Sequence, residues 1–317
     1  MTKQLKSEIR KDYIQDKYVI IAPRRSLRPR DEDINYEPRP YHRHAEKEKC
    51  VFCGKSIDIN LNKSLLMVGT KKNWQIVVVP NKYPAVSLGN PKAYGQQEVV
   101  VETPIHNVQL EDLPTSHLVK LLKVYADRTK TIMKNKKIEY ILIFKNNGGG
   151  AGASIQHTHS QIFATSFLPP HLADKSWQTQ AYKLKTGNCV YCDVITKEKK
   201  GPRLVYLDKY AIAIAPYASM YNYELWILPR RHLDNVTNLS NTERQSIAHM
   251  LKSALKKIAH KLKLPYNYYF HQVVHDEDQH LYLKLTPRGS HWAGVEIGSG
   301  LIINPVSPEQ AAKFYRQ

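Results

Sequence analysis

The chain has 317 residues, enough for two domains or one duplicated unit. Apolar residues make up 42% and charged residues 24%, which excludes a collagen-like or low-complexity chain, and no apolar run approaches the roughly 20 residues that span a bilayer. The net charge of +19 favours an anionic partner, either nucleic acid or a phosphorylated small molecule.

The first chemical motif along the chain is a cysteine pair, CVFC, at Cys50 and Cys53, and a second pair, CVYC, follows at Cys189 and Cys192. The segment MTKQLKSEIRKDYIQDK before them lacks the apolar stretch of a secretory signal, so we expect a cytoplasmic protein. Paired cysteines in that compartment indicate zinc or redox chemistry rather than disulfides. A polar segment and then a β-rich run follow each pair, which favours zinc.

Each cysteine pair heads a similar series of elements. In the first series, WQIVVVPNKYPAV and QQEVVVETPIH predict strands, residues 118–133 carry a helical stripe, and IEYILIFKNN and HTHSQIFA predict two more strands. In the second, RLVYLDKYAIAIAP and NYELWILPRRH predict strands, Ser240 and Glu243 predict a capping box that opens a helix, and YNYYFHQVV and QHLYLKLTP complete the set. We therefore predict an α+β protein with halves at residues 1–170 and 171–317, each an antiparallel-rich sheet with a long packed helix.

Aligning the two series places His106 opposite His232 and His157 opposite His280. Each half then offers two thiolates and two imidazoles, the donor set of a closed tetrahedral zinc site. The alternative is that the first histidine of each pair only lines a loop, but recurrence in register makes chance a poor explanation. A closed shell leaves no open position, so we expect two structural zinc ions per chain. The predicted ligands are Cys50, Cys53, His106 and His157 in the first half and Cys189, Cys192, His232 and His280 in the second.

A glycine-rich loop, KNNGGGAGAS, follows a strand predicted to end at Phe144 and leads into HTHSQ at residues 157–161. Glycines let the backbone approach a ligand and offer N–H groups to phosphate oxygens. Because residues two apart on a strand share a face, His159 and Gln161 are expected on the side of the zinc ligand His157. His159 would then be a free imidazole able to attack phosphorus, and Gln161 would donate a hydrogen bond to a phosphoryl oxygen. The alternatives are a second metal cluster or a satisfied polar strand.

The run GGGAGAS followed by HTHSQ resembles the active-site signature of the galactose-1-phosphate uridylyltransferase family, a branch of the histidine-triad superfamily. YVIIAPRRSLRPRD, CVFCG, VVPNKYPAV and GVEIGSGLIINPVSPEQAA resemble further segments of the family, so the resemblance covers nearly the whole chain. The AGAS and HSQ runs, the C-terminal loop and the second complete cysteine–histidine set resemble those of its ADP-glucose phosphorylase-like members. The resemblance implies two histidine-triad-like halves, a covalent nucleotidyl-histidine, ping-pong exchange, structural zinc and a homodimer.

The resemblance also implies roles for single residues. His159 would be the nucleophile, and Gln161 would bond the transferred phosphate. The substrate-binding residues that it implies are Arg25 and Arg28 for phosphates, Asn81 for the nucleotide, Asn146, Gly152 and Ser154 in the phosphate loop, and Glu296 for hexose hydroxyls.

The second half departs from the active motif. QHLYLK puts Tyr282 opposite His159 and Lys284 opposite Gln161, so we expect one active motif per chain. The predicted activity is exchange of a nucleoside monophosphate between a nucleotide sugar and a sugar 1-phosphate, with UDP-glucose and a hexose 1-phosphate as first choice. ADP-glucose with phosphate as acceptor is the alternative, and the base and hexose stay open. A zinc-stabilised nucleic-acid-binding protein is the alternative from another class, but most aromatic residues fall inside predicted strands and no nucleic-acid motif is present.

Overall fold

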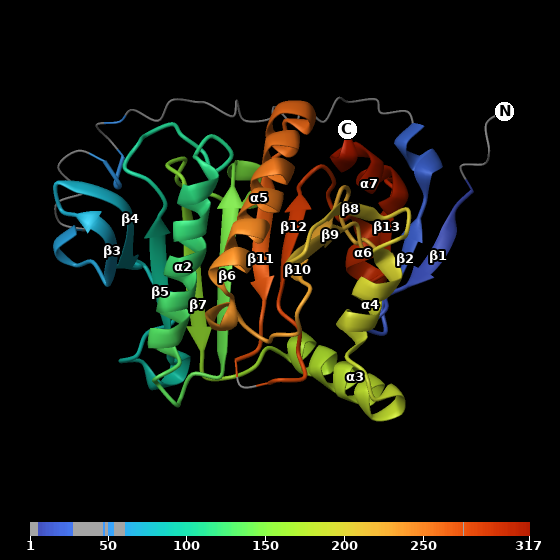
Figure 1. The fold of residues 1–317 in the computed structure, drawn as a ribbon, viewed down its shortest axis with the longest axis horizontal. Coiled ribbons are helices and arrows are strands. Elements are labelled where there is room, and N and C mark those ends of the chain that lie inside the picture. The colour runs from blue at the N-terminus through green and yellow to red at the C-terminus, as the bar shows by residue number, and fades with distance from the viewer. Residues whose placement is uncertain (1–5, 28–46, 48–49, 54–60, 275) are drawn as a thin grey trace.

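The computed structural model describes residues 6–27, 47, 50–53, 61–274 and 276–317. Their backbone forms one ten-stranded sheet, a separate three-stranded sheet and several helices (Figure 1). The runs rich in β-branched and aromatic residues form the strands, and the two apolar stripes form long helices. The predicted α+β fold is therefore confirmed. No helix within the described ranges is long and apolar enough to cross a membrane.

The strand order of the large sheet is symmetrical about its centre, where β6 pairs with β11. Outward from that pair, each strand of the first half has a counterpart at the same position in the second, as a duplication requires. The strands in sheet order, all antiparallel to their neighbours, are β3 (Leu66–Thr70), β4 (Asn73–Pro80), β5 (Gly95–Val101), β7 (His159–Thr165), β6 (Tyr140–Asn147), β11 (Tyr266–His271), β12 (Tyr282–Pro287), β10 (Leu225–Pro229), β9 (Ala211–Ile214) and β8 (Leu204–Leu207).

One continuous sheet thus runs through both halves, with Phe144 opposite Tyr269 and Asn147 opposite Tyr266 where they meet. The boundary after residue 170 stays a prediction, because the ladder between β6 and β11 joins the two halves through backbone hydrogen bonds.

Two long helices cover one face of this sheet. α2 (Thr115–Ile132) and α5 (Asn241–Lys257) contact each other and lie side by side across the strands in Figure 1. α5 begins at the predicted capping box, in which Ser240 and Glu243 each accept a hydrogen bond from the other's backbone N–H. The apolar stripes of both helices are buried in one core with the facing strands, and this burial holds the helices on the sheet.

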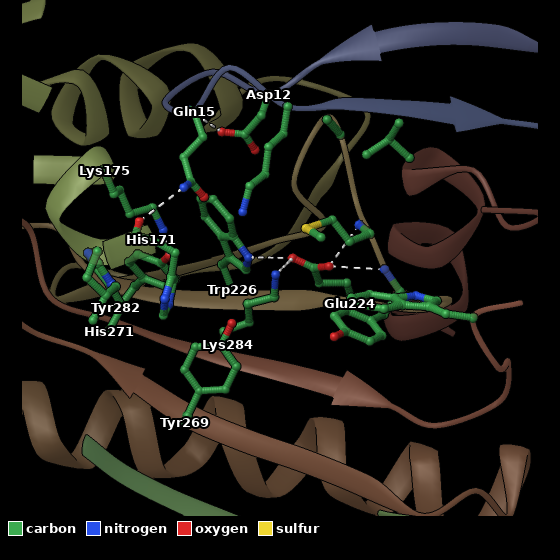
Figure 2. A pocket seen from close by; sticks show the side chains of 17 residues that line it. Asp12, Gln15, His171, Lys175, Glu224, Trp226, Tyr269, His271, Tyr282 and Lys284 are labelled. Atoms are coloured by element: carbon green, nitrogen blue, oxygen red, sulfur yellow. Dashed lines mark hydrogen bonds and ion pairs between the residues drawn. The ribbon is translucent and has the colours of Figure 1, made fainter. Parts of the chain in front are cut away.

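The remaining elements surround the second half. β1 and β2 form an antiparallel hairpin that β13 joins in parallel to β2. A cavity of about 280 Å³ is lined by the loop of this hairpin, by α3 and by β10, β11 and β12 (Figure 2). These remaining elements are β1 (Glu8–Lys11), β2 (Tyr18–Ile21), β13 (Ile302–Asn304), α3 (Pro170–Thr186), α4 (Val190–Glu198), α6 (Gly294–Ser299) and α7 (Pro308–Arg316), with short helical turns at Pro23–Leu27, Pro91–Ala93, Gly149–Ala151, Val236–Asn238 and Ile258–Leu262.

Candidate active site and metal centres

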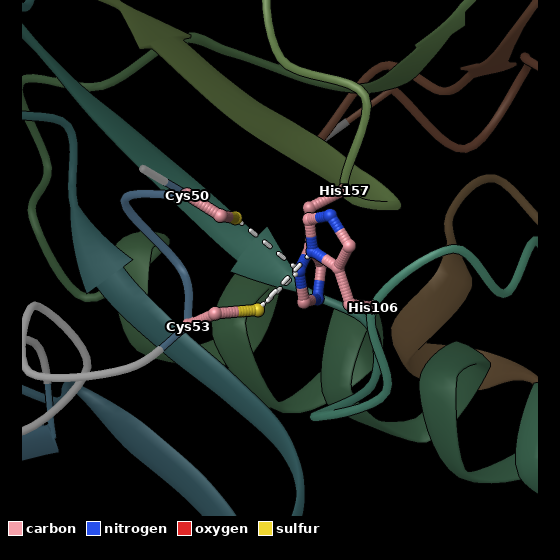
Figure 3. A group of neighbouring side chains, drawn as sticks. All are labelled: Cys50, Cys53, His106 and His157. Atoms are coloured by element: carbon pink, nitrogen blue, oxygen red, sulfur yellow. Dashed lines mark hydrogen bonds between the residues drawn. The ribbon is translucent and has the colours of Figure 1, made fainter. Parts of the chain in front are cut away.

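The first cysteine–histidine set converges beside the start of β7 (Figure 3). The ligand atoms of Cys50, Cys53, His106 and His157 all lie within 4.8 Å of one another. The Sγ of Cys53 lies 3.3 Å from Nδ1 of His106 and 3.2 Å from Nδ1 of His157, and the Sγ of Cys50 lies 3.6 Å from the latter. Zinc–sulfur bonds of about 2.3 Å and zinc–nitrogen bonds of about 2.0 Å at tetrahedral angles separate sulfur from nitrogen by about 3.5 Å, so the donor set fits zinc.

The second set assembles in the same way at the matching place in the other half. The ligand atoms of Cys189, Cys192, His232 and His280 also lie within 4.8 Å of one another. The Sγ of Cys192 lies 3.6 Å from Nδ1 of His232 and 3.7 Å from Nδ1 of His280. Both predicted ligand sets are therefore brought together by the fold, and both are compatible with zinc. His106 and His232 lie in the loops after β5 and β10 rather than at the strand ends where the sequence pattern places them.

Main-chain carbonyl groups orient three of the four histidines. Nε2 of His157 donates to the carbonyl oxygen of Thr103 at 2.7 Å. Nε2 of His232 donates to that of Glu277 at 2.8 Å, and Nε2 of His280 to that of Pro229 at 2.9 Å. Because a carbonyl oxygen only accepts, each Nε2 carries the proton and each Nδ1 presents its lone pair to the cluster.

His159 is the first residue of β7 and belongs to neither cluster. Its Nδ1 donates to the carbonyl oxygen of His157 at 2.8 Å, so the neutral ring carries its proton on Nδ1 and a lone pair on Nε2. Burial, followed by the nearby ammonium group of Lys145, lowers the pKa of the ring below its ordinary value. Among the described residues, no group of potential metal ligands includes His159.

A buried ion pair lies beneath the HTHSQ segment. Nζ of Lys145 lies 2.7 Å from Oε2 of Glu102 and donates to Oγ1 of Thr158 at 2.8 Å and to the carbonyl oxygen of His159 at 3.0 Å. Thr158 in turn donates to the same carboxylate oxygen at 2.7 Å. Sequence reasoning missed this pair, although a single lysine inside the apolar run IEYILIFKNN was a signal that it needs a buried partner.

Two side chains hold the amide of Gln161 in one orientation. Its Oε1 accepts from Nε2 of Gln97 at 2.9 Å and from Nδ2 of Asn81 at 3.5 Å. The predicted nucleotide residue Asn81 therefore lies beside Gln161, and the amide nitrogen of Gln161 is turned away from both partners. Gln97 was not predicted, because its contact with Gln161 depends on the pairing of β5 with β7.

The strand before the glycine-rich loop extends to the end of the run IEYILIFKNN rather than stopping at Phe144. β6 continues past Phe144 to Asn147, because β11 provides a pairing partner for the added residues. Nδ2 of Asn267, on β11, donates to Oδ1 of Asn146 and to the carbonyl oxygen of Ala151, both at 2.8 Å. The second half therefore fixes the loop that carries the predicted phosphate-binding residues.

Two glycines of this loop have backbone conformations that other residues rarely adopt. Gly148 has φ of +82° and Gly152 has φ of +85°. A Cβ at Gly148 would lie 2.9 Å from the Cβ of Pro265, whereas one at Gly152 would meet only the Nδ2 of Asn146, at 3.7 Å. Gly152 and Ser154 are exposed, so the loop presents its backbone to solvent.

Comparisons with known proteins agree with this geometry. A family model described as galactose-1-phosphate uridyl transferase, N-terminal domain, matches residues 1–169, and a domain of unknown function matches residues 112–314. The ADP-glucose phosphorylase of Arabidopsis thaliana is 31% identical over 98% of this chain and 92% of its own length. The galactose-1-phosphate uridylyltransferase of Thermotoga maritima is 27% identical over 98% of both.

Solved structures give the same result. A crystal structure of the Arabidopsis thaliana ADP-glucose phosphorylase with bound ADP-glucose matches with a TM-score of 0.86 over 98% of this chain and 99% of that one. A uridylyltransferase structure, 26% identical, matches with a TM-score of 0.75 over 98% and 97%. The chain belongs to the galactose-1-phosphate uridylyltransferase family. The family predicted from its motifs is therefore confirmed.

Two of the substrate residues that the family resemblance implies lie away from His159. Glu296 is in α6, which Figure 1 places beyond β10, whereas β6, β11 and β12 stand between β10 and β7. Arg25 lies in the short helical turn after β2, beside the second half of the chain. Arg28 lies outside the described residues. Partial burial opposes ionisation of Glu296, but the N–H of Ala293 and the charge of Arg25 outweigh it and lower its pKa. Within one chain, the structure does not bring these residues together with His159.

The second half of this family member replaces the reacting groups with an ion pair and an aromatic stack. Lys284, opposite Gln161 in the repeat, lies 2.7 Å from Oε1 of Glu224. Glu224 is the counterpart of Gln97 in the repeat, because each lies two residues before the residue that pairs with Lys284 or Gln161. An ion pair therefore replaces the amide pair of the first half. Tyr282 stacks on Trp226 with ring centroids 4.6 Å apart. This half therefore has no imidazole where the first half has His159.

Proposed function

We propose that this uridylyltransferase-like enzyme exchanges a nucleoside monophosphate between a nucleotide sugar and a sugar 1-phosphate through a covalent intermediate on His159. The observation that carries the proposal is the hydrogen bond from Nδ1 of His159 to the carbonyl oxygen of His157. This bond leaves Nε2, with its lone pair, as the reactive atom. In the first step Nε2 attacks the α-phosphorus, the bond from phosphorus to the bridging oxygen breaks, and the sugar 1-phosphate leaves with that oxygen. In the second step a phosphate oxygen of the acceptor attacks the same phosphorus and releases the imidazole.

Gln161 stabilises the charge that builds on the phosphoryl oxygens. Its carbonyl oxygen is held by Gln97 and Asn81, so its amide N–H groups are the ones that remain to donate to substrate. Asn146, Gly152 and Ser154 supply the loop that approaches the phosphates. The positive φ of Gly152 and the Asn267 bonds that fix the loop support this assignment.

Arg25 and Glu296 act in a second copy of the chain. They lie together beside the second half, away from His159 of their own chain, so a homodimer that places them against the partner's active loop would complete the substrate site. We propose a homodimer on this ground, with Arg25 and Arg28 contacting phosphates and Glu296 the hexose hydroxyls.

The cysteine–histidine clusters hold zinc, and the role of the zinc is structural. With four protein donors the shell is closed, so the ion would supply cross-linking rather than a bound water. In the first half, the ring of Phe52, between Cys50 and Cys53, lies 5.6 Å from the ring of His159. Zinc at this site would therefore hold the CVFC loop against the reacting histidine. All four cysteines are free of disulfides, as is usual in a reducing compartment, which supports the cytoplasm.

UDP-glucose with a hexose 1-phosphate is the first choice of substrates, supported by the uridyl transferase family model and the uridylyltransferase relatives. ADP-glucose with phosphate as acceptor is the second candidate, supported by 31% identity and a TM-score of 0.86 to the ADP-glucose phosphorylase. The two candidates share the same chemistry on His159 and differ in base and acceptor.

Mass spectrometry of the intact chain tests the proposal. Incubation with UDP-glucose and with ADP-glucose, in parallel and without acceptor, should add one nucleoside monophosphate, and the size of the increment identifies the base. His159→Ala should add nothing, whereas His249→Ala, which alters an exposed histidine of α5, should react as the wild type does. If neither sugar nucleotide adds mass, or the His159→Ala variant is still modified, the proposed intermediate is wrong.

A further inference from the structure

The degenerate half carries a cavity at the place where the active half carries its reacting histidine. Tyr282, which replaces His159, and Lys284, which replaces Gln161, both line this cavity of about 280 Å³. α3 contributes Lys175, and the β1–β2 loop contributes further side chains above it (Figure 2).

The side chains around the cavity are more basic than acidic. Lysine and histidine side chains reach it from four separate elements, and two carboxylates accompany them. The basic groups are Lys17, His171, Lys175, His271 and Lys284, and the carboxylates are Asp12 and Glu224.

Both carboxylates are already occupied by other donors. Glu224 accepts from Nζ of Lys284 at 2.7 Å, from Nε1 of Trp226 at 2.8 Å and from the N–H of Met220 at 2.9 Å. Oδ1 of Asp12 accepts from the backbone N–H groups of residues 14 and 15, each at 2.9 Å. Lys284 therefore neutralises Glu224, and the backbone engages Oδ1 of Asp12, whose charge still favours the ammonium form of Lys175.

Lys175 is the group for which this matters most. Its side chain is 8% exposed, and its Nζ donates to the hydroxyl of Tyr282. Within the described part of the chain no carboxylate forms an ion pair with Lys175 or Lys17. A buried ammonium group is costly, and burial lowers the pKa of Lys175 to about 7, although the charge of Asp12 favours the ammonium form. Burial and the charges of Lys17 and Lys175 likewise lower the pKa of His171, so these three groups repel one another.

We propose that this cavity binds a phosphoryl group, as inorganic phosphate or as a small phosphate monoester, with Lys175 as the central cation and Lys17 and His171 at the rim. A doubly charged anion would pair with all three groups at once and remove their repulsion, which a single carboxylate would do less completely. The stacked rings of Tyr221 and Trp292, 5.4 Å apart, border the same cavity and offer an apolar wall to the organic part of a monoester. This site is separate from the nucleotidyl transfer at His159 and does not depend on it.

Calorimetric titration of the full chain with inorganic phosphate and with glucose 1-phosphate tests the proposal, with sodium chloride at equal ionic strength as the reference. The His159→Ala variant excludes any contribution of the reacting histidine to the measured heat, and it should still bind phosphate in the cavity. Lys175→Met should weaken it by at least about tenfold, because a buried charge-assisted hydrogen bond is lost. Lys185→Met, which alters an exposed lysine of the same helix, should bind as the wild type does.

A second variant keeps the test decisive if Lys175→Met does not fold. His171→Leu removes an exposed rim group and should also weaken phosphate binding while leaving the thermal unfolding midpoint in chloride near that of the wild type. Stronger binding of glucose 1-phosphate than of phosphate would assign the monoester, and the reverse would assign free phosphate. The proposal is wrong if the wild type binds neither, or if both variants bind as well as the wild type. The Lys175→Met variant should still gain the mass of one nucleoside monophosphate when it is incubated with a nucleotide sugar. This measurement separates failure of the cavity proposal from failure of the transferase assignment.

Discussion

The ion pair beneath His159 allows a quantitative prediction. Glu102 is 0% exposed and Lys145 is 1% exposed, so neither charge is solvated. Lys145→Met would leave the Glu102 carboxylate with Oγ1 of Thr158 at 2.7 Å and the hydroxyl of Tyr125 at 3.4 Å as its side-chain donors. Stranding a buried charge in this way costs about 3–5 kcal/mol, and we expect the free energy of unfolding to fall by that amount.

The same substitution should slow nucleotidylation. Lys145 donates to the carbonyl oxygen of His159 and to Thr158, so its loss frees the strand that positions the imidazole. Urea unfolding at pH 7 gives the first quantity, and the rate of mass increment on the folded variant gives the second. Lys120→Met, on the exposed face of α2, is the control and should change stability by less than about 0.5 kcal/mol.

The double variant Glu102→Met, Lys145→Met decides whether the lost charge is the cause. Removing both charges should recover part of the stability, with a coupling free energy of about 0.5–3 kcal/mol. A loss below about 1 kcal/mol in the single variant would refute the reasoning, since a stranded buried charge costs more than that. Strict additivity of the two single variants would refute it as well.

Three further outcomes follow from the structure. Metal analysis should return about two zinc ions per chain, and Cys192→Ser should return about one, because it removes one donor of the second cluster. Burial lowers the pKa of Lys175 to about 7, below the value of about 10.4 in an unfolded chain, so the unfolded chain binds more protons between these values. The free energy of unfolding of the wild type should therefore rise from about pH 7 to pH 10 relative to that of Lys175→Met, and parallel slopes in urea melts would contradict this. Gly148→Ala and Gly152→Ala should each cost about 1 kcal/mol for the positive φ, and Gly148→Ala should cost more because its Cβ meets Pro265; equal thermal unfolding midpoints would count against the contact.

Some features of this protein depend only on residues close together in the sequence, so the sequence by itself determined them. The α5 capping box joins Ser240 to Glu243, three residues apart, and the helical stripes repeat with the period of the helix. The grouping of the two cysteine–histidine sets was also predictable, because the repeat brings the second pair of histidines, His232 and His280, into register with the first. A single set of four residues so far apart in sequence could be a coincidence, whereas the same pattern in both halves indicates that the residues belong together.

Strand order decided the rest, since residues far apart in sequence become neighbours only when the strands pair. Pairing of β5 with β7 puts Gln97 on Gln161, and the central pairing of β6 with β11 brings Asn267 to the phosphate loop and extends β6 to Asn147. The same order separates Glu296 from His159 by the width of several strands. Local periodicity specifies which face of a strand is buried, but the choice of neighbouring strand depends on the packing of the whole sheet, and only the tertiary structure reveals it.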